Sequence, residues 1–531
     1  MRLHIPLRLA SMASACVVSV GVPVSSDVHA GQATTFAPAK TASPTVSVQT
    51  GMLTGKRRGK VMAFLGIPYA GDTGGADRWR APRPAPPWQG LRAATAFGAD
   101  CQQDPPYSPP GGSPWSPAYF STGRMSEDCL SLNVWTTSLT DRKPVLVWIH
   151  GGGFAGGSGA VPIYDGVALA RQDVVVVSIN YRVGVFGFLA HPELTAEAGS
   201  SGNYGLMDQV AALRWVQRNI AKFGGDPAKV TVAGQSAGAA SVHALLATPS
   251  ARGLFRGAIA QSGSGMGIAA PPLAAAEAQG TRVAAAAGAV DIAALRRLPA
   301  EVVARASHAP DVGPPGLRFV PITEPIFLPD PAAERGDVPI LTGLTADEAS
   351  SSPDWKKSDA AALAALITKR FGASAASFAP YYTTLGESVL TARAVLRDQA
   401  TASMLLWAEG RPAHAAPVFG YRFDHPQDDA TGSRFGSFHT SDVPYVFGTV
   451  ATAVAQPRPV DRTIETLMGR YWMNFVRRGD PNGTGLPAWP AMAGGRIMMF
   501  EARSQAKAPM DKTLLDSYRT FARTGGKLSL F

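Results

Sequence analysis

Residues 230–247 read VTVAGQSAGAASVHALLA, and this stretch decides the fold. VTVA predicts a short buried strand, AASVHALLA predicts a helix, and between them residues 234–238 form the pattern G-x-S-x-G. In this context the pattern predicts a nucleophile elbow, a turn so tight that only glycine fits two residues to either side of the serine. We therefore expect Ser236 to have a strained backbone, with its Oγ above the sheet and a helix N-terminus beneath it.

Outward from this turn, short β-rich runs alternate with helical segments. The predicted strands are VLVWIH (145–150), VVVVSIN (174–180), VTVAG (230–234), GAIAQSG (257–263), PILTGL (339–344) and VFGYRF (418–423). Residues 205–225 carry apolar side chains at helical spacing, and residues 270–330 and 359–406 have the pattern of helical insertions. This order predicts an α/β fold: a mostly parallel central sheet with helices on both faces, and helical and loop insertions forming the pocket.

Composition and charge narrow the class of protein. The chain has 531 residues, of which 46% are hydrophobic, so it can bury a large core and is not disordered as a whole. A net charge of +10 could indicate a nucleic-acid partner, but the basic residues are scattered. The only tight cluster lies at 56–60, in a predicted hairpin turn. We expect no nucleic-acid partner, and only a modest preference for anionic substrates.

The N-terminus has the pattern of an export signal. Two arginines lie in the first eight residues, residues 9–24 are mostly apolar or small, and Val-His-Ala at 28–30 resembles a cleavage site. We predict that residues 1–30 are a signal peptide and that 31–531 form one catalytic domain with insertions. The mature protein would then be secreted or periplasmic.

Membrane attachment has little support in the sequence. A lipid anchor at Cys16 is the alternative to signal cleavage at residue 30, but Ala13 stands where a lipoprotein motif requires leucine. No later stretch reaches about 18 consecutive apolar residues. We expect neither a lipid anchor nor a membrane span.

The cysteines and metal-binding patterns also limit the chemistry. Loss of Cys16 with the signal leaves Cys101 and Cys129, an even pair that predicts a disulfide in an oxidising compartment; two buried free thiols are the alternative. Neither C-x-x-C nor H-E-x-x-H occurs, so we expect no metal site.

A glycine run follows the predicted strand 145–150. The sequence His-Gly-Gly-Gly-Phe at 150–154 lets backbone N–H groups approach a reacting carbonyl, and we expect Gly152, Gly153 and Ala237 to form an oxyanion hole. The same run matches the dinucleotide pattern G-x-G-x-x-G. We reject that interpretation because no helix is predicted at its third glycine and no acidic residue ends the next strand. We expect no cofactor.

A nucleophilic serine needs a base and an acid that holds the base. Among the histidines after Ser236, spacing leaves His425 and His439 as candidate bases. Asp347 and Glu348 both follow the predicted strand 339–344 and are equal candidates for the acid. The residues alone do not decide either choice.

A series of motifs decides both choices by resemblance. They are FLGIPYA, EDCLSLNVW, WIHGGGF, NYRVGVFGFL, the long run 202–243, QSGS, HTSDVPYVFG and RRGDPN, in this order between about 61 and 500. The chain resembles the type-B carboxylesterases, α/β-hydrolases that include bacterial para-nitrobenzyl-type esterases and the cholinesterases.

The resemblance implies the α/β-hydrolase fold and a serine carboxylesterase that acts on small-molecule esters through an acyl-enzyme. It implies that Ser236 is the nucleophile, His439 the base and Glu348 the acid, and it also pairs Cys101 with Cys129. The chain departs from the family at Gln235, where the cholinesterase branch has Glu. It departs again at Ala349 in place of a common Gly, and at Asp442 in place of a common Glu, a change that could shift the loop that orients His439.

The substrate is the least determined part of this prediction. Phe154, Gln235 and Trp115 are candidate pocket residues, and their character favours aromatic or short to medium-chain esters. Amidase or specialised ester hydrolysis on the same triad is an alternative, as is a non-catalytic binding protein of the same fold. The sequence gives no indication of oligomeric state.

Overall fold

The computed structural model describes residues 42–104, 112–264, 270–313, 319–334, 337–352, 355, 360–382, 388–412 and 414–529. Residues Ser43–Phe531 form one compact unit. The predicted signal peptide and Cys16 lie outside the described residues, so both remain predictions. Among the helices described, none is long and apolar enough to cross a membrane.

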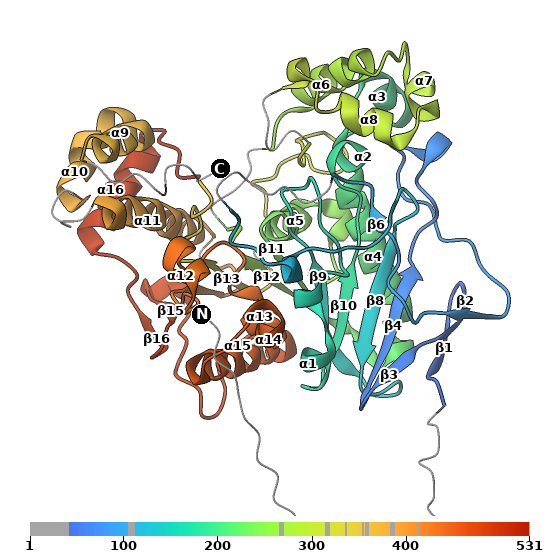
Figure 1. Cartoon of the computed structure of the whole chain (residues 1–531), viewed down its shortest axis with the longest axis horizontal. Coiled ribbons are helices and arrows are strands. Elements are labelled where there is room, and N and C mark those ends of the chain that lie inside the picture. Colours follow the sequence, from blue (N-terminus) through green and yellow to red (C-terminus); the bar gives the residue numbers. More distant parts are fainter. Residues whose placement is uncertain are drawn as a thin grey trace, which may run out of the picture. The chain divides into compact units, whose positions relative to one another are not determined.

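The centre of the fold is an eleven-stranded sheet in the order β16-β15-β14-β13-β12-β11-β9-β10-β8-β4-β3 (Figure 1). Its strands are β3 (Lys56–Arg58), β4 (Val61–Pro68), β8 (Ser131–Thr136), β9 (Lys143–Ile149), β10 (Val175–Ile179), β11 (Gly225–Gln235), β12 (Gly257–Gln261), β13 (Ile340–Thr345), β14 (Val418–Phe423), β15 (Ile497–Phe500) and β16 (Gln505–Lys507). From β10 to β15 all neighbours are parallel. The outer pairs are antiparallel. The predicted mostly parallel sheet is confirmed.

The sheet is covered on both faces. Alternate residues of β9 belong to different cores, with Val147 and Ile149 in one and Leu146 and Trp148 in the other. Helices α4 (Tyr204–Asn219) and α5 (Ala237–Ala247) pack into the first core, and α15 (Pro459–Arg478) packs into the second. A strand buried on both faces explains the nearly continuous apolar runs in the sequence.

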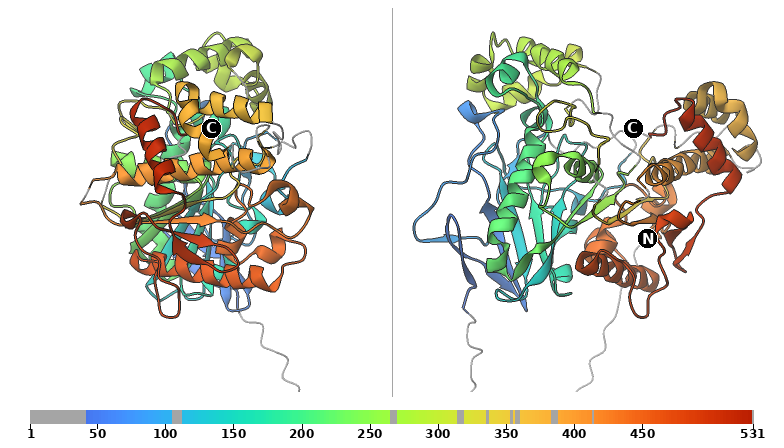
Figure 2. Two further views of the ribbon diagram at one scale, coloured as in Figure 1. Left: turned by 90° about the vertical axis from the view of Figure 1, so that its left-hand side faces the viewer. Right: turned by 180° about the vertical axis from the view of Figure 1, so that it is seen from behind.

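The remaining helices lie between strands or at the end of the chain. They are α1 (Val167–Ala170), α2 (Gly184–Phe188), α3 (Pro192–Ala198), α6 (Leu273–Ala286), α7 (Ile292–Arg297), α8 (Ala300–Ala306), α9 (Ala360–Phe371), α10 (Ala375–Tyr382), α11 (Ser388–Glu409), α12 (Ala430–Phe435), α13 (Val443–Phe447), α14 (Val450–Ala453) and α16 (Lys512–Arg523). Both predicted helical insertions are present: α6–α8 lie beside α3, and α9–α11 lie beside α16 (Figures 1 and 2).

The first insertion is helical over a shorter range than predicted. Its last α-helix ends at Ala306, and the described residues from 307 to 330 include only a short 3-10 turn, Pro310–Val312. Prolines recur throughout this part of the sequence. Each proline lacks a backbone N–H and disfavours a helical conformation in the residue before it, so the alanine-rich pattern does not continue as helix.

Candidate active site

Ser236 occupies the turn between β11 and α5. Its φ is 57° and its ψ is −123°, a strained conformation for a residue with a side chain. The turn is held on both sides, because the Ser236 N–H donates to the Gln261 carbonyl at 2.9 Å and the Ala240 N–H donates to the Ser236 carbonyl at 2.9 Å. The structure therefore has the strand–turn–helix context that G-x-S-x-G predicts.

Close backbone contacts require both glycines of this turn. A Cβ at Gly234 would lie 2.4 Å from the carbonyl carbon of Gly238, and a Cβ at Gly238 would lie 2.1 Å from the carbonyl oxygen of Ile149. Both distances are shorter than real Cβ contacts allow. The steric reason given for the motif is confirmed.

Glu348 and His439 form a buried ion pair. The Nδ1 atom of His439 donates to Glu348 Oε2, and the other carboxylate oxygen accepts from Ser262 Oγ at 2.6 Å and from the Thr345 N–H at 2.7 Å. Burial alone would lower the pKa of His439, but the charge and hydrogen bond of Glu348 outweigh burial and raise it. The carboxylate thus fixes the tautomer of the ring and favours its protonated form.

Two predicted pocket residues contact His439. The Gln235 amide nitrogen lies 3.1 Å from His439 Nε2, the ring nitrogen that is left to act as a base. The indole N–H of Trp115 donates to the His439 backbone carbonyl at 3.1 Å. Gln235 and Trp115 therefore position the histidine, besides any contact they make with a ligand.

Asp442 anchors the segment that carries His439. Its Oδ2 accepts from the Tyr421 hydroxyl at 2.5 Å and from the Gln261 amide at 2.9 Å, and burial raises the pKa of its carboxyl. These bonds tie the segment to β14 and β12. The shorter Asp side chain, a departure noted in the sequence, is thus accommodated by a tyrosine and a glutamine.

The two other candidates from the sequence have different partners. Asp347 accepts from the Ser437 N–H at 2.7 Å, and burial raises the pKa of its carboxyl to about 6. His425 is hydrogen-bonded to Asp461 Oδ1 at 2.6 Å, near the start of α15. Asp347 therefore supports the backbone before His439. His425 instead contacts Asp461 in the first turn of α15.

The predicted oxyanion loop follows β9 and is braced by one amide side chain. Gly152 and Gly153 have positive φ values of 117° and 63°. Gln103 accepts from the Gly157 N–H at 2.7 Å and donates to the Gly157 carbonyl at 2.9 Å and to the Cys101 carbonyl at 3.0 Å. Since Cys101 is disulfide-bonded to Cys129, the loop is linked to the disulfide through Gln103. The predicted pairing of these cysteines is present.

The third predicted donor and the pocket residue Phe154 lie beside this loop. Ala237 is the first residue of α5, so its N–H has no acceptor within the helix. Phe154 is fully buried and packs edge-to-face against Phe188. It lines a cavity of about 320 Å³ together with His243 and Trp407.

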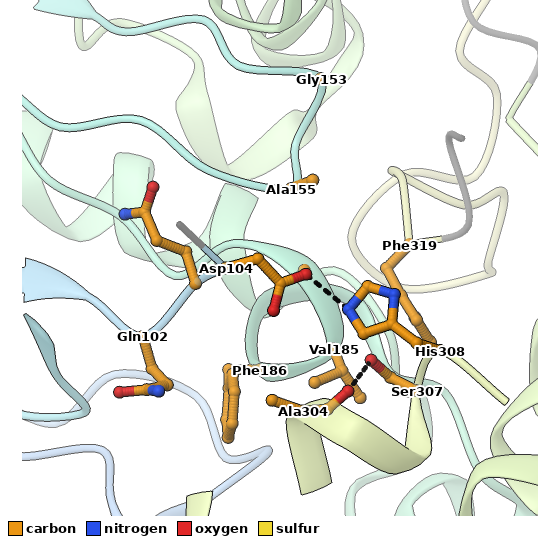
Figure 3. Close-up of a pocket in the computed structure, with 12 residues that line it drawn as sticks. Gln102, Asp104, Gly153, Ala155, Val185, Phe186, Ala304, Ser307, His308 and Phe319 are labelled. Atoms are coloured by element: carbon orange, nitrogen blue, oxygen red, sulfur yellow. Dashed lines mark hydrogen bonds and ion pairs between the residues drawn. The ribbon is translucent and has the colours of Figure 1, made fainter. Parts of the chain in front are cut away.

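A separate cavity of about 310 Å³ lies against Gly153 (Figure 3). Its apolar walls include Val185, Phe186 and Phe319. On one side, Asp104 and His308 point toward one another and form an ion pair at 2.5 Å. This cavity has the size and lining of a small-molecule subsite. Among the described residues, no group of three or more His, Cys, Asp or Glu side chains is placed to hold a metal ion.

The sequence analysis missed the supporting residues Ser262, Gln103 and Thr345. A signal for Ser262 exists, since it follows β12 within the QSGS motif. In the structure, backbone strain also marks residues of this site. Of the six non-glycine residues with positive φ in the described part of the chain, four lie in or beside this site: Phe154, Ser236, Ser262 and Thr440.

Comparisons with known proteins point to one family. The model of the carboxylesterase family matches residues 42–518. A fumonisin B1 esterase of Sphingopyxis macrogoltabida is 34% identical over 485 residues, which cover 83% of this chain and 84% of the relative. A para-nitrobenzyl esterase of Bacillus subtilis (strain 168) is 34% identical over 482 residues, covering 84% and 92%.

Solved structures show the same similarity. A carboxylesterase of Geobacillus stearothermophilus superposes with a TM-score of 0.76 at 36% identity, covering 89% of this chain and 99% of the other. A structure titled PNB esterase superposes with a TM-score of 0.76 at 29% identity, covering 90% and 99%.

Proposed function

The chain belongs to the carboxylesterase family and is a carboxylic ester hydrolase, and we propose that it works through an acyl-enzyme on Ser236. The observation that carries the proposal is the buried Glu348–His439 pair, whose Nε2 lies 3.1 Å from the amide of Gln235, the residue before Ser236 in the strained turn. A serine needs such a base to become a nucleophile at neutral pH.

In the proposed reaction, Ser236 Oγ attacks the ester carbonyl while His439 Nε2 takes its proton. Glu348 stabilises the imidazolium that forms, and the N–H groups of Gly152, Gly153 and Ala237 stabilise the oxyanion. The intermediate collapses when His439 returns the proton to the leaving alcohol. Water, deprotonated by His439, then attacks the acyl-enzyme and releases the acid.

Gln235 adds one step to the proposed reaction. Its amide lies on the Nε2 lone pair that must accept the serine proton. We propose that this hydrogen bond is exchanged for one from Ser236 when substrate binds. The amide would then be free to turn toward the substrate.

We propose that the cavity against Gly153 receives one part of the ester. A volume of about 310 Å³ and walls that include Phe186 and Phe319 support aromatic or short to medium-chain groups. The named relatives include a fumonisin B1 esterase, a phenmedipham hydrolase and a para-nitrobenzyl esterase, so the family accommodates diverse substrates.

We also propose that the protein is exported and loses residues 1–30. The sequence pattern of the N-terminus supports this, and so does a disulfide, which persists in oxidising compartments. N-terminal sequencing of the protein from periplasmic and culture fractions tests the proposal. A mature N-terminus near Gly31 is expected, and an intact N-terminus in the exported protein would contradict it.

The test of the function measures initial rates on p-nitrophenyl esters from acetyl to palmitoyl, with wild type and Ser236→Ala. We expect a maximum at short or medium chains and a loss of at least about 10³-fold in kcat in the variant. A p-nitroanilide series measures amidase activity alongside. Hydrolysis that survives in Ser236→Ala would refute the assignment of the nucleophile.

A further inference from the structure

A third cavity, of about 350 Å³, lies along α4 and shares no residue with the candidate active site. Its lining includes the basic residues Arg83, Arg214 and Arg218 and the apolar residues Met207, Val210 and Phe327. No acidic side chain of the described residues lines the cavity. The cavity thus combines an apolar wall with a rim whose charge is entirely positive.

The charge comes mainly from Arg214 and Arg218, which are four residues apart on α4. Side chains at this spacing are neighbours, and two like charges there slightly destabilise a helix. Arg214 donates to the Ser250 carbonyl at 3.3 Å and Arg218 donates to Gln49 Oε1 at 2.9 Å. Both acceptors are neutral, and no ion pair of either arginine with a described carboxylate is present. No carboxylate in the described part of the chain therefore neutralises their charges.

Arg83, the third arginine in the lining, has an acidic partner. Arg83 is paired with Asp77, which lies outside the lining. The net charge at the rim is therefore supplied by the two arginines of α4. Since α4 is held to the fold by the buried Arg182–Asp208 ion pair, at 2.7 Å, these arginines project from a fixed helix.

The apolar wall lies on the same helix and on the loops facing it. Met207 and Val210 precede the arginines by about one to three turns of α4. Phe327 and Pro84 line the cavity from other segments, and Val210 and Phe327 are buried. A ligand that fits both parts needs an anionic head and an apolar body. At roughly 30 Å³, the volume that one water molecule occupies in the liquid, a cavity of about 350 Å³ has the volume of about a dozen waters.

We propose that this cavity is a binding site for an amphiphilic carboxylate, a medium-chain or aryl carboxylic acid. The carboxylate pairs with Arg214 and Arg218, since guanidinium groups match carboxylate geometry, and the body packs against Met207, Val210 and Phe327. Ester hydrolysis releases carboxylic acids, so an esterase generates ligands of this class. The site itself does not depend on the chemistry proposed for Ser236.

Equilibrium dialysis of radiolabelled decanoate, with decanol as the uncharged analogue, tests the proposal. Wild type is expected to bind decanoate saturably, at least tenfold more tightly than decanol, and more weakly as ionic strength rises. The double variant Arg214→Gln/Arg218→Gln is expected to lose at least tenfold in affinity while hydrolysing esters at the wild-type rate. The control Arg503→Gln/Arg523→Gln removes the same charge from two exposed positions and is expected to change binding less than twofold.

A second variant keeps both arginines. Ala211→Glu places a carboxylate in the lining, one turn before Arg214, and is expected to abolish decanoate binding without loss of helix, as measured by circular dichroism. Binding that is equal in wild type and the Arg214→Gln/Arg218→Gln variant would overturn the proposal and assign the ligand to another site. Decanol binding as tight as decanoate binding would also overturn it, because the rim would then contribute nothing.

Discussion

Replacement of Gln103 by leucine is expected to reduce turnover without weakening substrate binding. The side chain makes three hydrogen bonds, two to the peptide groups of Gly157 and one to Cys101, and does not reach Ser236 or His439. Leucine has a similar volume but offers no donor or acceptor. The loop that carries Gly152 and Gly153 would lose its brace, while the triad keeps its geometry.

The hydrogen bonds set the magnitude. Two neutral bonds to Gly157, at about 0.5–1.5 kcal/mol each, hold the loop by roughly 1–3 kcal/mol, and the bond to Cys101 anchors the Gln103 side chain. Complete loss of one oxyanion donor costs about 10²–10³-fold in kcat. Because leucine loosens the donors without removing them, we expect kcat to fall about 10- to 100-fold, or roughly 1.4–2.7 kcal/mol, with KM within about threefold of wild type.

The assay compares kcat and KM with the inhibition constant of a trifluoromethyl ketone, which presents an oxyanion to the same donors. In Gln103→Leu the inhibition constant should rise by the same factor as kcat falls. Gln102→Leu is the matched control, because Gln102 lines the same cavity but makes none of these bonds. A variant of Gln103 with wild-type kcat, or an equal loss in the Gln102 control, would refute the reasoning.

Four further predictions concern the base and the turn. The pKa of His439 is raised and the base must be unprotonated, so the acid limb of the kcat/KM–pH profile should have its midpoint above about 6.5. Glu348→Gln removes the carboxylate that raises the pKa of His439 and leaves burial, which lowers it. We therefore expect a lower midpoint and about 10²–10⁴-fold lower kcat. An unchanged midpoint would contradict this. Gln235→Glu places a negative charge beside Nε2 and should raise the midpoint, so opposite shifts in these two variants are the critical result. Gly238→Ala puts a Cβ 2.1 Å from the Ile149 carbonyl oxygen and should lower the melting temperature and the soluble yield; wild-type thermal stability by differential scanning fluorimetry would show that the turn relaxes freely.

Features that depend on neighbouring residues could be predicted from the sequence. The strained turn at Ser236 follows from glycines two residues away on each side, and the sheet follows from runs of buried β-branched residues. Strands β8, β15 and β16 were not predicted. β15 and β16 have only four and three residues, too few to show a distinctive local pattern.

Contacts between distant segments could not be predicted in this way. Asp347 and Glu348 are adjacent, yet one carboxylate binds the Ser437 N–H and the other binds the His439 ring. Which side chain faces which partner depends on the path of the backbone after β13, relative to a loop about 90 residues later. From the residues alone the two acids were equal candidates, and resemblance to a family was needed to choose.

The α/β class, the position of the candidate nucleophile Ser236 and the glycine loop beside it follow from local periodicity and steric exclusion, so they could be predicted without a structure. The tertiary structure decided that Glu348 rather than Asp347 contacts His439, and that Gln235 lies on its second nitrogen. It also placed Gln103 against the glycine loop after β9, and it brought two arginines to a cavity on α4 without an ion pair to any described carboxylate. The physical reason is that hydrogen bonds and ion pairs act over a few ångströms, and only folding brings side chains separated by tens to hundreds of residues within that range.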